Sequence, residues 1–364
     1  MESNMDIFNR LIEDHAIRIK RGRIFDHRLI PKPADFDFDR VEGMLLGVAI
    51  GDSLGITSEG MLAPERKALF GEIRDYIPNR YVDKAIGFPS DDTQLTFWTL
   101  EQMIADGGFV PDHVAKSFLN NRIFGLGSAV REFLTNYSSG SPWHRSGPAS
   151  AGNGALMRIS PVLVPHLKKG GTALWVDAAL CAMMTHNDTC SISACMGFTA
   201  MLWELLNMSS PPDAHWWLER YVEVAKDVEN GTVYTPRGGC FSDFSGPAWQ
   251  FVQEKVSWAN RQDLPVVDAC NAWYSGAFLL ETLPCVIYIL MRHGRDPEEA
   301  IVRAVNDTKD NDTIAAIIGA AVGALHGKKA IPQRWIENLS GRTTNSDDGR
   351  IFELIEEAKK AFWI

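Results

Sequence analysis

The sequence of 364 residues has few cysteines, no long apolar run and no excess of positive charge. Its six cysteines form no CxxC pair, so in a chain of this size we expect them to be mostly buried small hydrophobes. No stretch approaches the roughly 18 apolar residues of a membrane span, and the opening residues MESNMDIFNRLIEDH lack the apolar core of a secretory signal. The net charge of −10 creates no positive field for nucleic acid or anionic membranes. We therefore expect a cytoplasmic protein that binds neither.

Hydrophobic residues make up 45% of the chain, enough for a large core at the upper end of what one domain holds. Residues 1–40 differ from the rest. A stretch with apolar residues on one helical face leads into a basic run from Arg18 to Arg23, and Pro31 and Pro33 then break the pattern. We predict an N-terminal extension, residues 1–40, and a main domain, residues 41–364.

The main domain shows helical spacing of its apolar residues, for example in residues 93–104, 190–206 and 279–291. Alternating runs typical of strands are scarce. Residues 43–51 and 314–327 are apolar on most sides and rich in small residues, which lets neighbouring backbones approach closely in a deep core. This pattern predicts an all-α fold.

Two acidic clusters of matching composition each precede an apolar helix: residues 90–93 (SDDT) and residues 310–313 (DNDT). Their carboxylates and hydroxyls are hard oxygen ligands suited to Mg²⁺ or Mn²⁺, and two clusters can supply a two-metal site. Each cluster alone also fits helix capping, which satisfies free N–H groups and the helix dipole. Burying several unpaired carboxylates without a cation would be costly, and this favours the metal site.

Other metal motifs fit less well. A calcium-binding EF-hand loop beginning at Asp307 fails, because Lys309, Asp312 and Ile318 stand where an acid or amide, a glycine and a glutamate are needed. A magnesium-dependent isoprenoid synthase, also all-α, is an alternative, although residues 91–95 (DDTQL) do not meet its DDxxD pattern.

Five segments in order resemble the ADP-ribosylglycohydrolase family. They are residues 43–59 (GMLLGVAIGDSLGITSE), 90–94 (SDDTQ), 152–161 (GNGALMRISP), 185–186 (TH) and 281–327, which opens ETLPCVIYIL and ends GAAVGALHG. The resemblance covers about residues 41–327. It implies an orthogonal multi-helix bundle with an N-terminal extension.

The resemblance also implies a site for two Mg²⁺ ions, with Mn²⁺ as an alternative. The implied ligands are Ser90, Asp91, Asp92, Asp310, Asp312 and Thr313. The family usually has Thr at the position of Ser90, which keeps the hydroxyl, and GDTDT where residues 309–313 read KDNDT. We expect Asn311 to be tolerated if its side chain points away from the ions, whereas Lys309 places a cation beside them.

The same resemblance implies a catalytic residue and a substrate site. Glu59 matches a family glutamate with a base or gating role; its alternative is an ordinary loop carboxylate. The implied substrate residues are Ser150, Gly152, Asn153, Gly154, His186, Gly125 and Gly127. The glycine-rich loops would offer backbone N–H groups to the ribose and pyrophosphate. His186 is otherwise a satisfied core histidine, and Trp273 with Tyr274 is a further candidate, as a platform for adenine.

The implied activity is magnesium-dependent removal of ADP-ribose from modified protein side chains. ADP-ribosylarginine is the first choice of target, with ADP-ribosylserine and O-acetyl-ADP-ribose as alternatives that no residue decides. A non-catalytic binding protein would be expected to have lost acids at the metal positions, and here they are retained.

The N-terminal extension suggests a second role. Some family members protect a bacterium from an ADP-ribosyltransferase toxin, and the basic run of residues 18–23 could enter a toxin cleft built for the diphosphate of NAD. Alternatively, residues 1–40 pack on the protein's own surface with the basic run solvated. Loss of toxin binding on deletion of residues 1–35, with hydrolysis intact, would support the first hypothesis.

Overall fold

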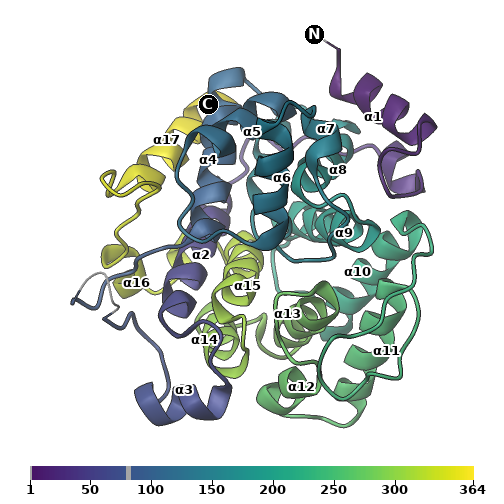
Figure 1. Ribbon diagram of the computed structural model, residues 1–364. Helices are drawn as coiled ribbons and strands as arrows, with labels where there is room; N and C mark the ends of the chain where they lie inside the picture. The colour runs from purple at the N-terminus through teal and green to yellow at the C-terminus, as the bar shows by residue number, and fades with distance from the viewer. Residues whose placement is uncertain (1, 79–82) are drawn as a thin grey trace.

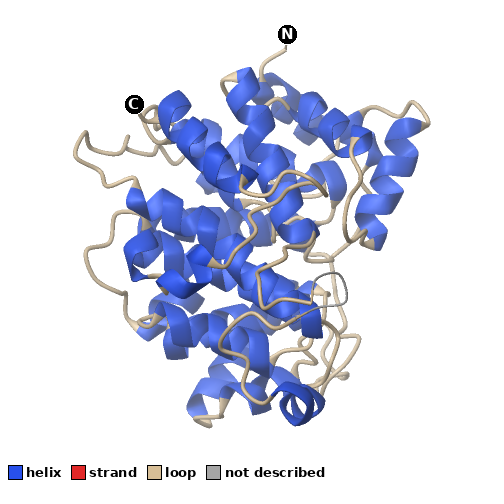
Figure 2. Ribbon diagram, turned by 90° about the vertical axis from the view of Figure 1, so that its left-hand side faces the viewer, coloured by secondary structure: helices blue, strands red, loops and turns tan. Residues whose placement is uncertain are grey.

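The computed structural model describes residues 2–78 and 83–364 and is built almost entirely of helices (Figures 1 and 2). The α-helices are α1 (Asn4–Glu13), α2 (Asp39–Gly55), α3 (Ala63–Phe70), α4 (Asp91–Asp106), α5 (Pro111–Asn120), α6 (Ser128–Ser138), α7 (Trp143–Ser146), α8 (Ala173–Thr185), α9 (Thr189–Leu205), α10 (Ala214–Val228), α11 (Ala248–Arg261), α12 (Val266–Ala272), α13 (Leu279–His293), α14 (Pro297–Asp307), α15 (Asn311–His326), α16 (Gln333–Glu337) and α17 (Arg350–Phe362). Among the described residues, β pairing is limited to isolated bridges. The predicted all-α fold is confirmed.

Helices α2 and α15 form the centre of the molecule, and their backbones touch through glycines. A Cβ on Gly47 would lie 2.0 Å from the carbonyl oxygen of Gly319, and one on Gly43 would lie 2.6 Å from that of Gly323. Because residue numbers rise along one helix as they fall along the other, the two helices run antiparallel. The C-terminal end of α2 therefore meets the N-terminal end of α15, where the second acidic cluster lies.

The α2 helix with its short 3₁₀ continuation, residues 39–58, is long and apolar enough to cross a membrane by length and composition. Its environment is that of a core helix, because 89% of the apolar window is buried inside the protein. Its apolar character is therefore explained by packing against α4, α14 and α15.

The N-terminal extension packs against the main body. Phe8 of α1 and Phe25 are buried, and their ring centroids lie 4.5 Å apart. The side-chain amide of Asn4 donates to Asp177 of α8 at 2.7 Å, and the backbone N–H of Lys20 donates to the carbonyl of Val228 at 3.0 Å. Deleting residues 1–35 would therefore remove core side chains together with the basic run.

The basic run lies on the surface beside acidic groups of the same chain. Arg21 forms an ion pair with Asp26 at 2.6 Å, and Arg23 approaches Asp227 at 3.7 Å with its own side chain 96% exposed. This arrangement matches an extension that covers the protein's own surface. Binding of a toxin by this segment stays a prediction.

Candidate functional site

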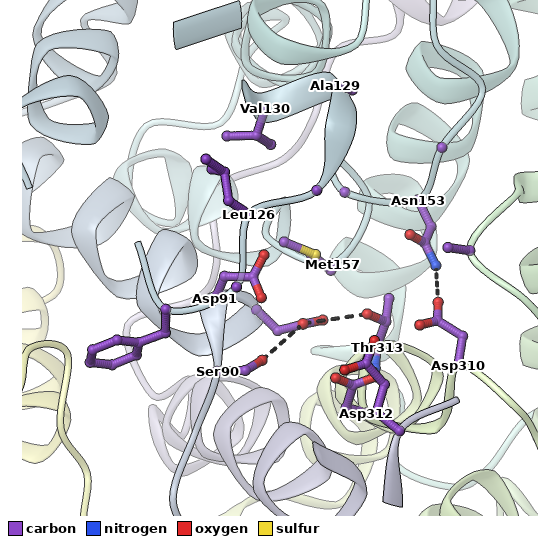
Figure 3. Close-up of a pocket in the computed structure, with 18 of the residues that line it drawn as sticks. Ser90, Asp91, Leu126, Ala129, Val130, Asn153, Met157, Asp310, Asp312 and Thr313 are labelled. Atoms are coloured by element: carbon purple, nitrogen blue, oxygen red, sulfur yellow. Dashed lines mark hydrogen bonds between the residues drawn. The ribbon is translucent and has the colours of Figure 1, made fainter. Parts of the chain in front are cut away.

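Apart from the candidate adenine platform, all the residues predicted to bind metal or substrate line one cavity of about 1120 Å³. They arrive from separate parts of the chain: the end of α2, the starts of α4, α6 and α15, the loop before residue 155, and the end of α8. Figure 3 shows Ser90 and Asp91 on one side, Asn153 and Asp310 on the other, and Asp312 with Thr313 between them. The two acidic clusters therefore face the same space.

Neither acidic cluster caps its own helix with the side chain of its N-cap residue. Ser90 at α4 and Asp310 at α15 accept no N–H bond from the first turn. The cap of α4 comes instead from Asp52 of α2, whose carboxylate accepts the N–H groups of Ser90 at 2.9 Å and Thr93 at 3.1 Å and the Thr93 hydroxyl at 2.5 Å. The capping alternative therefore fails for Ser90 and Asp310.

The carboxylates form two groups that share one member. Oxygens of Asp52, Asp92 and Asp312 all lie within 4.8 Å of one another, and so do oxygens of Glu59, Asp310 and Asp312. Asp52, Asp92 and Asp312 are buried, with at most 3% of each residue exposed. Burial raises the pKa of all three carboxyl groups, and repulsion from neighbouring carboxylates adds to the rise for Asp92 and Asp312.

The donor set suits a divalent cation. One oxygen of Asp92, Oδ1, is buried without a hydrogen-bond partner. The other, Oδ2, accepts the hydroxyls of Ser90 and Thr313, each at 3.3 Å. Hard oxygen atoms converge there, which is the chemistry that Mg²⁺ and Mn²⁺ require. An orphaned buried carboxylate oxygen is costly unless an ion completes it.

The more accessible carboxyls of the site are affected in the same direction. Burial raises the pKa of Asp91 to about 8 and that of Asp310 to about 7, with neighbouring carboxylates adding to both rises. Burial also raises the pKa of Glu59. Asp91 lies outside both carboxylate groups and stands next to Gly125, where a Cβ would lie 2.5 Å from its Oδ1.

These shifts predict how stability responds to pH without a cation. A carboxyl whose pKa is raised in the folded state binds protons more tightly there than when unfolded. Its stabilising effect is therefore full below the unfolded pKa and is lost as pH rises through the folded value. In chelator, we expect the free energy of unfolding to fall between about pH 5 and about pH 8, by up to about 1.4 kcal/mol per group and pH unit, and Tm to fall with it.

Adding Mg²⁺ or Mn²⁺ should stabilise the protein most at the upper end of that range, because the cation binds the ionised form. Scanning calorimetry across pH, with and without cation, measures both effects. Equal Tm values with and without cation throughout the range would contradict a cation site.

The loop of residues 150–154 is fixed against the second acidic cluster. Asn153 donates its side-chain amide to Asp310 at 2.6 Å and to the Thr282 hydroxyl at 3.0 Å. From beneath, the Ser191 hydroxyl donates to the carbonyls of Ser150 and Gly152. Asn153 thus joins the predicted substrate loop to the predicted metal ligands.

His186 lies under the same loop and is buried. A Cβ on Gly154 would lie 3.0 Å from its ring. A larger residue at position 154 would therefore require the loop or the imidazole to move. Burial, assisted by Arg158, lowers the pKa of His186 to about 3, and Nδ1 is paired with the Thr185 hydroxyl at 2.9 Å. The ring is therefore neutral at physiological pH. Gly127 has no such neighbour and ends the turn before α6.

Two of the departures from the family's usual sequence, Lys309 and Asn311, involve side chains that other partners hold. Asn311 points away from the carboxylates, since its amide donates to the Ser58 hydroxyl and to the carbonyl of Val305, each at 3.0 Å. The ammonium of Lys309 contacts the hydroxyl of Tyr274 and lies 4.1 Å from the centre of that ring. Both side chains are thus held by other partners.

The proposed adenine platform is wrong for Trp273. Its side chain is buried, at 1% exposure, and packs edge-on against Tyr288. Tyr274 is 40% exposed but does not line the cavity and is paired with Lys309. Trp273 is thus buried in the core and Tyr274 lies outside the cavity lining, so neither ring offers a free face to the cavity.

Sequence reasoning missed three features of the site. One is Asp52, a fully buried member of the first carboxylate group that does not line the cavity; its signal was an acid directly after the apolar residues 43–51. Another is the guanidinium of Arg342, which lies 3.2 Å from the ring centre of Phe88 and 4.2 Å from that of Phe124. The third is Arg237, which lines the cavity over Phe278. The arginines sit in loops, where no periodic pattern marks them.

Gln94 explains how these loops meet. Its amide donates to the carbonyls of Arg122 at 3.0 Å and Thr343 at 2.7 Å, and its oxygen accepts the N–H of Phe124 at 2.9 Å. The C-terminal segment is also paired with the chain before α4, because Ser340 donates its N–H to the carbonyl of Gly87. The motif glutamine therefore builds one wall of the cavity.

Comparison with known proteins agrees with this architecture. The family model described as ADP-ribosylglycohydrolase matches residues 33–362. An uncharacterised protein of Archaeoglobus fulgidus is 30% identical over 84% of this chain and 92% of its own. ADP-ribosylarginine hydrolase Tri1 of Pseudomonas putida is 23% identical over 83% of this chain and 74% of its own. The ADP-ribosyl-dinitrogen reductase glycohydrolase of Rhodospirillum rubrum is 24% identical over 83% and 90%. A solved structure, described as an ADP-ribosylglycohydrolase-related protein complex, matches with a TM-score of 0.63 and 26% identity over 89% of this chain and 97% of that one.

Proposed function

We propose a function from one established premise: this chain belongs to the ADP-ribosylglycohydrolase family. The proposed reaction is cation-dependent hydrolysis of the bond between C1″ of ADP-ribose and a protein side chain, with ADP-ribosylarginine as the first target. The observation that carries it is Asp312, which belongs to both carboxylate groups of a cavity that has room for a nucleotide-sized ligand.

The residues suited to hold cations are the two carboxylate groups with the neighbouring hydroxyls of Ser90 and Thr313. Two Mg²⁺ ions bound there would supply positive charge that orients the ribose hydroxyls and makes a water molecule more acidic. Asp52 also holds the N-terminus of α4, so it combines a structural role with its place in the acidic group.

Glu59 is suited to act as the general base. It is the exposed member of its group, and it lines the cavity within 4.8 Å of oxygens of Asp310 and Asp312. Cleavage of the C1″ bond passes through a transition state with oxocarbenium character, so an attacking water must lose a proton as charge develops. The Glu59 carboxylate can accept that proton, and its raised pKa brings its basicity nearer to the working pH.

The remaining cavity residues are suited to bind the ADP-ribose. The loop of residues 150–154 presents backbone without bulky side chains, and the start of α6 after Gly127 offers free N–H groups of a helix N-terminus to phosphate. Asn153, which donates to Asp310, would keep this loop in register with the reacting ribose. His186 contributes shape and a neutral ring.

Arginine is our first choice of linkage because the name of the Pseudomonas relative specifies ADP-ribosylarginine. ADP-ribosylserine and O-acetyl-ADP-ribose are the alternatives. To decide, the purified protein is offered all three substrates at saturating Mg²⁺, and released ADP-ribose is measured as an initial rate. We expect the arginine linkage to be cleaved fastest. A faster rate on ADP-ribosylserine or O-acetyl-ADP-ribose would change the proposed target but leave the proposed hydrolase activity in place. No release of ADP-ribose from any of the three substrates would overturn the proposed function.

A further inference from the structure

Glu59 is carried by a tight turn formed by residues 58–61. The N–H of Met61 donates to the carbonyl of Ser58 at 3.2 Å. Glu59 has φ −52° and ψ 138°, and Gly60 has φ 79°. These angles define a type II turn, in which the third residue needs positive φ and is therefore usually glycine. The position of the Glu59 carboxylate thus depends on how this turn is held.

Arg66 of α3 holds both ends of the turn. Its side chain is fully buried. Nε donates to the Ser58 hydroxyl at 2.9 Å, and Nη2 donates to the carbonyls of Ser58 at 3.2 Å and Met61 at 3.0 Å. Nη1 donates to the carbonyl of Asn306 at the end of α14, at 3.0 Å. Only the planar fork of arginine reaches four acceptors from one side chain; a lysine has three donors on a single atom.

The same turn is tied to the segment that carries the second acidic cluster. The N–H of Gly60 donates to the carbonyl of Lys309 at 2.9 Å. Asn311 donates its amide to the Ser58 hydroxyl at 3.0 Å, so that hydroxyl accepts from Asn311 and Arg66 together. The segment of residues 306–311, immediately before Asp312, therefore contacts the turn directly at two points, through Lys309 and Asn311, and is joined to it at a third through Arg66.

We propose that Arg66 is a positioning residue that fixes the turn of Glu59 in register with Asp310 and Asp312. Asn311 supports the same turn through its hydrogen bond to the Ser58 hydroxyl. The proposal rests on the base role of Glu59 in the proposed function. It assigns a purpose to the buried guanidinium, and it explains why Asn311 replaces the family's usual threonine: its amide reaches the Ser58 hydroxyl.

The test uses the full chain with Arg66→Met, the milder Ser58→Ala, and Arg40→Met as matched control. Arg40 also donates its guanidinium to two backbone carbonyls, those of Leu205 and Leu325, but at the opposite end of α15 from Asp312. Amide hydrogen exchange of residues 57–62 is followed, because Gly60 and Met61 lose their N–H partners if the turn opens. We expect exchange of these amides to speed up by about tenfold or more in both test variants and to stay unchanged in Arg40→Met.

Hydrolysis and ADP-ribose binding supply the second measurement. Arg66→Met should lower kcat by about 10- to 100-fold while the Kd of ADP-ribose changes by less than about twofold, as expected for a residue that orients a catalytic group. Adding Glu59→Gln to Arg66→Met should cause little further loss, because both remove the same placed carboxylate. Arg66→Lys should recover part of kcat.

The outcomes separate the two claims. Unchanged exchange in both test variants, or full additivity with Glu59→Gln, would overturn the positioning role. If Arg66→Met does not fold, Ser58→Ala decides by the same two measurements. If the wild-type protein hydrolyses none of the three substrates, the proposed function fails, and the exchange data still decide whether Arg66 holds the turn.

Discussion

Replacing Asp312 by asparagine is expected to abolish hydrolysis and, in chelator, to raise Tm. Asp312 is the member shared by both carboxylate groups, so its loss weakens both cation positions at once. Losing several kcal/mol of transition-state stabilisation corresponds to a fall in kcat/KM on the order of a thousandfold. Stability should change in the opposite direction, because Asp312 is buried beside Asp92 and Asp310 and its ionised form is destabilised there.

Asp307→Asn is the matched control for this variant. Asp307 is also a buried acid with a raised pKa, about 6 through burial, but it pairs with Arg303 at 3.4 Å and does not line the cavity. Its replacement should leave kcat/KM nearly unchanged, because Asp307 belongs to neither carboxylate group and does not line the cavity. Initial rates and calorimetry on the two variants check both signs. Activity retained in Asp312→Asn would contradict the assignment of Asp312 as the shared ligand.

Replacing Gly47 by alanine is expected to destabilise the fold severely. The new methyl group would lie 2.0 Å from the carbonyl oxygen of Gly319, a backbone atom that cannot turn aside. Alanine gains about 1 kcal/mol in helix propensity over glycine, whereas forcing the α2 and α15 backbones apart should cost about 3 kcal/mol or more. We therefore expect a large fall in Tm, with activity reduced because Asp52 and Asp312 are carried by these two helices.

Gly108→Ala provides the comparison, since a Cβ there meets no atom within 4 Å. It should leave Tm unchanged or raise it slightly. Denaturant unfolding gives the free energies for both variants. A Gly47→Ala protein as stable as the wild type would show that the close contact of α2 with α15 is not required.

Much of this architecture could be predicted from the sequence. Helical periodicity predicts all-α structure, and the small residues of 43–51 and 314–327 predict core helices that neighbouring backbones approach closely. The structure shows that the two helices are each other's neighbours, through Gly47 and Gly319. The acidic clusters of residues 90–93 and 310–313 could be recognised because each stands directly before a helix, and resemblance linked them into one site. These signals are local or periodic, so a single sequence carries them.

The remaining features depend on contacts between distant segments. Asp52 of α2 caps α4 although it is thirty-eight positions away from Ser90. No local sequence pattern predicts a cap that comes from another helix. Arg342 lies against Phe88 and Phe124. Gln94 holds the loops of Arg342 and Phe124 together, because it hydrogen-bonds to the backbone of Thr343 and of Phe124. Trp273 was misjudged because aromatic content alone does not separate a buried ring from a stacking surface; packing against Tyr288 decides it.

The central claim is that the cavity containing Asp92, Asp310 and Asp312 hydrolyses ADP-ribosyl linkages with the help of bound divalent cations. The most direct test is the rate of ADP-ribose release by the wild-type protein from ADP-ribosylarginine protein, first in Mg²⁺, then in excess EDTA, then with Mg²⁺ restored. We predict release in Mg²⁺, loss of release in EDTA and full recovery on restoration. Release that continues undiminished in EDTA would contradict the account.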